Sequence, residues 1–313
     1  MKKTSRKRAT QIGVYSALAG GAVGFALGML FAPKRGPDAR RRVAYQVERL
    51  SGWTALDTKW DTLFQTGPAD LVVLPEYAAM EAALMAAPPT LSPLQWRDQA
   101  ADRAGAWCDL AAAFATRHAC HLLAGTGPVR TPRGLVNRAW LVGPDGIVAH
   151  QDKLILTPYE RETLGLVPGD GLKVFDTGLG RIGILTCYDC EFPILARRLA
   201  EAGADMILVP SCTDGPAGRT RVRQSARARA IESQCLVVQA PLVGRVAGCD
   251  IVDDSTGRAG LFCPPDHGLP GDGILAQGET DRAGPVVAEL DPMAISAPRQ
   301  TGQAGNFSPR DEQ

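Results

Sequence analysis

The sequence predicts an α/β fold, and three apolar stretches are the main evidence for it. In residues 181–211 an apolar run is followed by a cysteine, a helix-like segment and a second apolar run. Two other apolar runs, at 71–74 and 147–154, lead to or contain a charged residue. The runs are short, rich in β-branched residues and leucine, and bounded by Gly and Pro, which is typical of strands buried on both faces. Strands that alternate with helices in this way predict a sheet covered by helices.

The first 42 residues differ from the rest of the chain. Residues 12–32 carry no charge, and five basic residues lie on each side of them. The stretch is as long as the roughly 20 residues that span a bilayer, and Gly20, Gly24 and Gly28 would share one helix face. The trailing APKRG and the glycines resemble the anchor region of YtxH-type bacterial proteins. We therefore expect a membrane-anchor helix over 12–32, with an interfacial or soluble helix as the alternative.

The rest of the chain is predicted to form one catalytic domain over 43–296, followed by a flexible polar tail at 297–313. A first strand is expected at 43–50, and a helix at 54–65, where apolar residues recur at helical spacing. Later helices are expected at 96–116, 193–202 and 220–233, and later strands at 71–74, 121–126, 135–142, 147–154, 182–186, 206–209, 236–240, 257–262, 273–276 and 286–290.

Three side chains with acyl-transfer chemistry lie on these strands or at their ends. Glu76 follows the run 71–74, Lys153 lies in the run 147–154, and Cys187 follows the run 182–186. Each alone has a structural explanation, as a helix cap, a solvated edge charge or a buried core thiol. Together they suffice for acyl transfer, because a carboxylate can take the thiol proton while an ammonium stabilises the oxyanion. The backbone N–H of Tyr188 is expected to complete the oxyanion site.

The motifs LPE, DKLILTP and GILTCYDCEFP, in this order, resemble the nitrilase (carbon–nitrogen hydrolase) superfamily over residues 43–291. The resemblance implies an α–β–β–α sandwich, in which two mixed sheets face each other and helices cover the outsides. It also implies a Glu76–Lys153–Cys187 triad, paired subunits and no metal or organic cofactor. The step Cys187-Tyr188-Asp189 resembles the amidase and carbamoylase branch, whereas true nitrilases typically show Cys-Trp-Glu.

Relatives in this superfamily have a further glutamate after the lysine. The spacing to the PGD turn at 168–170 favours Glu162 for this position, and Glu160 is the alternative. A carboxylate there would keep Lys153 charged while Glu76 serves as the base.

Composition excludes several other classes of function. The net charge is +1, with 34 basic and 33 acidic residues, which argues against an electrostatic nucleic-acid binder. The cluster RHACH at 117–121 and the pair Cys187-x-x-Cys190 have no second cluster at metal-ligand spacing, so no metal site is expected.

The sequence thus predicts a cysteine-dependent hydrolase of linear amides or N-carbamoyl compounds, acting on non-peptide carbon–nitrogen bonds through a thioester. A nitrile hydrolase or an N-acyltransferase with the same triad is one alternative, and a catalytically silent membrane-tethered scaffold is another. We expect a small-molecule substrate, a homodimer or higher homo-oligomer, and no nucleic-acid partner. The expected location is at a membrane, with the catalytic domain in the cytoplasm; a soluble cytoplasmic protein is the alternative.

Overall fold

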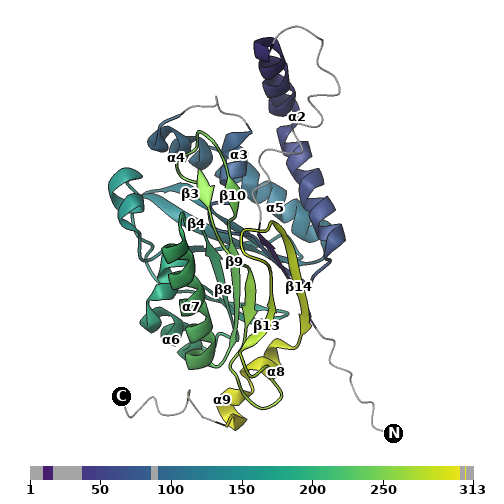
Figure 1. Cartoon of the computed structure of the whole chain (residues 1–313), viewed down its shortest axis with the longest axis vertical. Helices are drawn as coiled ribbons and strands as arrows, with labels where there is room; N and C mark the ends of the chain where they lie inside the picture. Colours follow the sequence, from purple (N-terminus) through teal and green to yellow (C-terminus); the bar gives the residue numbers. More distant parts are fainter. Residues whose placement is uncertain (1–9, 17–36, 86–90, 304–306, 308–313) are drawn as a thin grey trace.

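The computed structural model describes residues 10–16, 37–85, 91–303 and 307. Within these residues two six-stranded sheets face each other, and helices lie on their outer sides (Figure 1). This confirms the predicted α/β sandwich of two facing mixed sheets. The stretch 181–211 also forms the predicted order of strand, cysteine, helix and strand.

Both sheets are mixed, with parallel strands in their centres. The first sheet has the order β14 (Gly284–Leu290), β1 (Thr10–Ser16), β2 (Leu71–Val73), β3 (His121–Thr131), β4 (Gly134–Val142) and β5 (Val148–Asp152). The second has the order β13 (Ile274–Gln277), β12 (Gly260–Phe262), β9 (Leu236–Pro241), β8 (Met206–Ser211), β7 (Gly180–Ile184) and β6 (Val174–Thr177). A separate ribbon pairs β10 (Gly244–Arg245) with β11 (Asp254–Ser255). The parallel pairs are β1–β2, β2–β3, β7–β8 and β8–β9.

The helices connect these strands and cover the sheets. They are α2 (Pro37–Thr66), α3 (Met80–Leu84), α4 (Pro93–Ala101), α5 (Ala104–His118), α6 (Pro193–Glu201), α7 (Pro216–Ser233), α8 (Pro292–Ser296) and α9 (Pro298–Thr301). Two short turns complete the set: η1 (Tyr159–Thr163), which is π-helical, and η2 (Cys187–Glu191), which is 3₁₀-helical. Figure 1 shows α6 and α7 side by side along β8 and β9.

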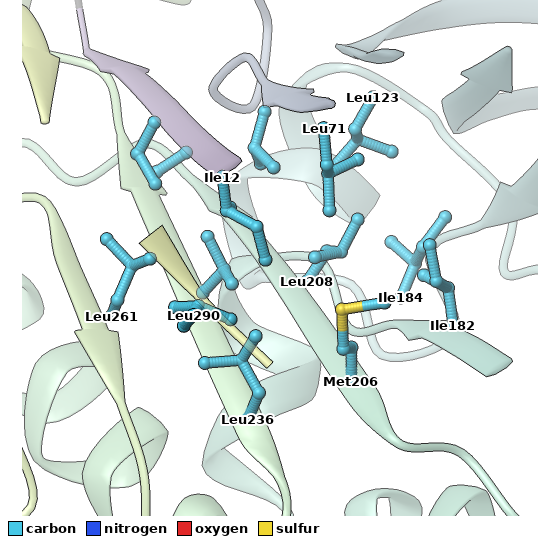
Figure 2. Packing of buried hydrophobic residues seen from close by; sticks show 14 of the residues in the cluster. Ile12, Leu71, Leu123, Ile182, Ile184, Met206, Leu208, Leu236, Leu261 and Leu290 are labelled. Atoms are coloured by element: carbon cyan, nitrogen blue, oxygen red, sulfur yellow. The ribbon is translucent and has the colours of Figure 1, made fainter. Parts of the chain in front are cut away.

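The two-residue period of the strands divides the apolar side chains among three layers of core. In β2, Leu71 and Val73 face the other sheet, whereas Val72 packs under α2 and α5. In β8, Leu208 faces the first sheet, whereas Ile207 packs under α6 and α7. Successive strand residues point to opposite faces, so a fully apolar strand can serve two cores at once. Figure 2 shows the central layer, where side chains of both sheets meet.

The predicted first strand at 43–50 is wrong, because these residues lie in α2. The strand position next to β2 is taken by β1, which pairs in parallel with β2 and antiparallel with β14. The sheet therefore includes residues that precede the predicted domain start at 43. The predicted helix at 54–65 does form as the second half of α2, where Leu56 and Trp60 are buried.

The predicted membrane-anchor helix over 12–32 is also wrong where the structure describes it. Residues 12–16 belong to β1, and Ile12 and Val14 are fully buried between the sheets. Their apolar character serves the protein core, so it does not indicate a bilayer. None of the helices in the described residues is long and apolar enough to span a membrane. The predicted membrane-associated location is therefore wrong, since Ile12 and Val14 of the expected anchor lie in the protein core. Residues 17–32 lie outside the described part.

The start of the predicted flexible tail is attached to the sandwich. Arg299 in α9 donates from Nε to Ser233 O at 3.0 Å and from Nη2 to Ala204 O at 2.6 Å. The guanidinium thus satisfies a carbonyl at the end of α7 and another that precedes β8, which holds α9 against the second sheet.

The burial of β1 can be tested by core truncation. We expect Ile12→Ala to lower the free energy of unfolding by about 2–5 kcal/mol, because it leaves a cavity between the sheets. Gln11→Ala, at the exposed neighbouring position, is the matched control and should change it by less than about 0.5 kcal/mol. Urea unfolding of both variants gives the comparison. Equal stability of Ile12→Ala and the unmodified protein would contradict the place of β1 in the core.

Candidate active site

Glu76, Lys153 and Cys187 come from both sheets and meet at one end of the sandwich. Glu76 follows β2, Lys153 follows β5 and Cys187 begins η2 after β7. The exposed fractions of the three residues are 1%, 1% and 5%. The carboxyl ends of β2 and β7 supply two of the groups, as expected for the ligand-binding edge of an α/β sheet.

The Glu76 carboxylate is the centre of the contacts. Its Oε1 accepts from Lys153 Nζ at 2.9 Å, and its Oε2 accepts from the backbone N–H of Cys212 at 2.8 Å. The Cys187 Sγ lies 3.5 Å from Cys212 O, which accepts its hydrogen bond. Cys212 directly follows β8, so its backbone joins the carboxylate to the thiol.

Strained turns present these side chains. Cys187 has φ +48° and Tyr77, next to Glu76, has φ +58°, in the left-handed region that non-glycine residues rarely adopt. Gly125 allows the turn after β2 to lie against β3. A Cβ at Gly125 would lie 2.3 Å from Pro75 O, so a larger residue there would displace Glu76. The few non-glycine residues with this conformation in proteins cluster at functional sites, where contacts with the surrounding structure offset the strain.

A second buried carboxylate, Glu160, completes the ion cluster. Lys153 Nζ lies 2.7 Å from Glu160 Oε2 and 2.9 Å from Glu76 Oε1. Glu160 Oε1 accepts from Tyr77 Oη at 2.9 Å and from Asn137 Nδ2 at 3.0 Å. The same Asn137 Nδ2 donates to Glu76 Oε1 at 3.0 Å. One ammonium and one amide therefore bridge two carboxylates.

The structure places Glu160, the alternative in the sequence analysis, against Lys153, and it places the preferred Glu162 away from it. Glu162 is exposed, whereas Glu160 is 2% exposed and contacts Lys153. The reason is local: Thr157 N donates to Glu160 Oε2 at 2.9 Å, and Glu160 N donates to Thr157 Oγ1 at 3.3 Å. This reciprocal pair has the spacing of a capping box, S/T-x-x-E, and turns the Glu160 side chain inward. That spacing was a readable signal in the sequence.

Opposite charges determine the protonation of the lysine and of Glu160. Burial alone would lower the pKa of Lys153, but the carboxylates Glu76 and Glu160 raise this pKa well above its ordinary value. Burial alone would raise the pKa of Glu160, but Lys153 and the donors from Thr157 and Asn137 hold this pKa below its ordinary value. Lys153 and Glu160 therefore form a charged pair near neutral pH.

Glu76 and Cys187 are shifted the other way. Burial raises the pKa of Glu76, with a further rise from Glu160, and Lys153 only partly opposes it. Burial and the Glu76 carboxylate raise the pKa of the Cys187 thiol well above its ordinary value, and Lys153 opposes this rise. A hydrogen bond between the Cys187 and Glu76 side chains lowers the pKa of Glu76, against the effect of burial. The thiol and the carboxylate therefore compete for one proton.

The sequence did not identify two of the groups around the cluster. These groups are the amide of Asn137 and the hydroxyl of Tyr77. Their partners lie 61 and 83 residues away in the chain, so no local pattern indicates the contacts. Tyr188 lies in η2 as expected, and the role of its N–H stays a prediction. In the part of the chain that the structure describes, no three His, Cys, Asp or Glu side chains are grouped to hold a metal.

The chain matches the family model for carbon–nitrogen hydrolases over residues 49–260, which is more than half of its length. The chain belongs to the carbon–nitrogen hydrolase family. The match includes Glu76, Lys153 and Cys187 and begins after residues 12–32, so the resemblance of that segment to YtxH-type proteins stays a prediction.

Curated proteins from several organisms are similar to parts of this chain. The probable hydrolase YhcX of Bacillus subtilis is 34% identical over 197 residues, which cover 63% of this chain and 38% of that protein. The deaminated glutathione amidase of Yersinia enterocolitica is 42% identical over 85 residues, 27% of this chain and 30% of that protein. The nitrilase of Pyrococcus abyssi is 35% identical over 122 residues, 39% of this chain and 44% of that protein. The chain thus spans less than half the length of each of these relatives.

Solved structures show the same fold at low sequence identity. A carbon–nitrogen hydrolase from Helicobacter pylori G27 has a TM-score of 0.70 and 17% identity, and the alignment covers 97% of this chain and 96% of that chain. An amidase from Nesterenkonia sp. has a TM-score of 0.59 and 20% identity, with coverage of 98% and 95%. These likenesses show the fold of this chain.

The inward position of Glu160 predicts a pH effect on stability. Because its folded pKa is lowered, its contribution is present above the unfolded value of about 4.3 and is lost as pH falls through the lower folded value. We expect Glu160→Gln to have lower stability than the unmodified protein at pH 7 and a weaker loss of stability on acidification. Urea midpoints between pH 3 and 7 measure this. Glu162→Gln, at the exposed position, is the control, and an effect of Glu162→Gln equal to that of Glu160→Gln would contradict the assignment.

Asn137 can be tested by removing its donor. We expect Asn137→Leu to lower the free energy of unfolding by about 3 kcal/mol, because two buried carboxylates each lose a hydrogen bond. Asn137→Asp is the isosteric comparison. Because it adds a negative charge, it should lower the free energy of unfolding more at pH 8 than at pH 5. Chemical unfolding at both pH values measures this. A pH-independent loss for Asn137→Asp would contradict the bridging role.

Proposed function

We propose that this carbon–nitrogen hydrolase cleaves linear amides or N-carbamoyl compounds through a thioester on Cys187. The observation that carries the proposal is the placement of Glu76 in contact with Lys153 and with the backbone that binds the Cys187 thiol. Acyl transfer requires a base that lies close to a nucleophile and to a cation. The contacts and the family membership support these roles for the three residues.

The first step is proton transfer from Cys187 to Glu76. The negative charge of Glu76 is one cause of the high pKa of the Cys187 thiol. When Glu76 takes the proton, that repulsion disappears and the new thiolate lies near the Lys153 ammonium. The raised pKa of Glu76 makes it a stronger base than an ordinary carboxylate.

Bond formation follows. The thiolate attacks the carbonyl carbon, and the oxygen takes the electron pair as an oxyanion beside Lys153 Nζ and the N–H of Tyr188. The carbon–nitrogen bond breaks, and Glu76 gives its proton to the leaving nitrogen. Glu76 then takes a proton from water as the water oxygen attacks the thioester carbon. The carbon–sulfur bond breaks, the Cys187 sulfur takes the proton back from Glu76, and the carboxylic acid leaves. Through these steps Glu160 holds Lys153 charged and in place.

Nitriles are the second candidate substrate class, because a relative that bears the name nitrilase is 35% identical over 122 residues. The amide class is preferred because several similar proteins are named amidases. Deaminated glutathione, the substrate in the name of one relative, belongs in the substrate panel.

A homodimer or higher homo-oligomer also remains our proposal, and light scattering after size-exclusion chromatography measures it.

The decisive measurement is ammonia release from primary amides, ureido acids and nitriles. We expect Cys187→Ala to reduce the rate by about 10⁴-fold or more, because the nucleophile is lost. Cys190→Ala, a buried thiol in the same turn, is the matched control and should keep activity within a few-fold of the unmodified protein. Full hydrolysis by Cys187→Ala would overturn the proposal.

A further inference from the structure

Asp189 is a buried carboxylate that joins the lysine segment to the cysteine turn. It is 1% exposed and lies two residues after Cys187. Its Oδ1 accepts from Ile155 N at 2.7 Å and from Leu154 N at 3.2 Å. Its Oδ2 accepts from Thr186 N at 3.3 Å and also lies 3.3 Å from Leu154 N.

These backbone donors flank the two reacting groups. Leu154 and Ile155 directly follow Lys153, and Thr186 directly precedes Cys187. Other backbone contacts hold Lys153 on its own side of the sandwich: its N–H donates to Asn137 O at 2.8 Å, and its carbonyl accepts from Gly169 N at 2.8 Å. The Asp189 carboxylate instead reaches from the turn after β7 to the segment after β5, and these strands belong to different sheets.

We propose that Asp189 is a positioning residue, whose carboxylate holds the backbones of Lys153 and Cys187 at the separation that acyl transfer needs. The inference rests on the proposed function, since it concerns the same site. The Asp189 carboxylate accepts hydrogen bonds from backbone N–H groups beside the two reacting residues, so it acts through the two segments that it connects. A displacement of about 1 Å between reacting groups can cost about 100-fold in rate.

The contact set requires a carboxylate. All its partners are N–H donors, and an ionised carboxylate offers only acceptors. An asparagine would place an NH₂ group against Leu154 and Thr186 or against Ile155, so one half of the connection would be lost. A protonated carboxyl group would have the same defect, because its O–H would face a donor.

Protonation of Asp189 falls in an accessible range of pH. Burial raises the pKa of Asp189, and the Glu160 carboxylate adds to this rise. Lys153 and the N–H groups of Ile155 and Leu154 lower the pKa, and the net result is a pKa of about 7. The connection is therefore present above about pH 7 and weakens as pH falls through that value. Lys153 and Glu160 are the charged groups that act on Asp189, and both keep their charge in this range.

The test compares Asp189→Asn, Asp189→Glu and Glu81→Gln. Glu81 is a buried carboxylate that pairs with Lys59 at 2.6 Å outside the site, so it controls for the loss of a buried charge. Two readouts are taken between pH 5 and 9: kcat and KM for an amide that the unmodified protein hydrolyses, and the rate of alkylation of Cys187 by iodoacetamide, read by mass spectrometry. Thermal unfolding of each variant accompanies them.

We expect Asp189→Asn to lower kcat by about 100-fold with a much smaller change in KM, and to lose the step near pH 7 in both readouts. Asp189→Glu keeps an acceptor-only group, so it should restore the pH step and part of kcat. Glu81→Gln should keep the unmodified profile even if its melting temperature falls. If Asp189→Asn does not fold, the pH step of Asp189→Glu decides the question.

Two results would overturn the inference. One is an Asp189→Asn variant with unchanged kcat and unchanged alkylation profile. The other is an equal loss of kcat in Asp189→Asn and Glu81→Gln, which would indicate general destabilisation. If the unmodified protein hydrolyses no compound, the proposed function fails, and the alkylation profiles still decide whether Asp189 positions Cys187 because they need no substrate.

Discussion

The rest of the site depends on one buried ammonium, Lys153, shared between two carboxylates. Moving each such charge out of water costs several kcal/mol, and only close opposite charges and hydrogen bonds offset this. The cluster therefore needs every donor around it, including the amide of Asn137 and the hydroxyl of Tyr77. One cation also cannot neutralise two anions, so Glu76, which has fewer donors than Glu160, has the higher proton affinity. The imbalance of charge is what makes Glu76 suited to act as a base.

The sandwich brings these groups together because its two sheets face each other. The first sheet contributes Glu76 and Lys153, and the second contributes Cys187 and the Cys212 backbone. The apolar layer between the sheets sets their separation, and the ends of the central parallel strands set which residues emerge at the same edge. The site is therefore an interface between two halves of one core, and packing between the sheets and chemistry at their edge are coupled.

Family membership and the solved structures account for the fold, whereas the named relatives match this chain over less than half of their own length. The chemistry proposed for the site depends on the short contact between Glu76 and Lys153 and on the raised pKa of the Cys187 thiol.

The sequence alone determined most of the strands after residue 70 and the three groups that meet at the site. The resemblance of its motifs to a known family also indicated the two facing sheets. These features depend on local periodicity and on short motifs that lie within a few residues. Tertiary structure decided the rest. It places residues 12–16 in the core, because an apolar run fits a sheet or a bilayer equally well until its partners β2 and β14 are known. It shows that the T-x-x-E spacing at Thr157 and Glu160 is a capping box, which turns Glu160 rather than Glu162 toward Lys153. It also gives Asn137 its carboxylate partners 23 and 61 residues away and Asp189 its donors on Leu154 and Ile155, 35 and 34 residues away, because no local pattern encodes contacts between such distant segments.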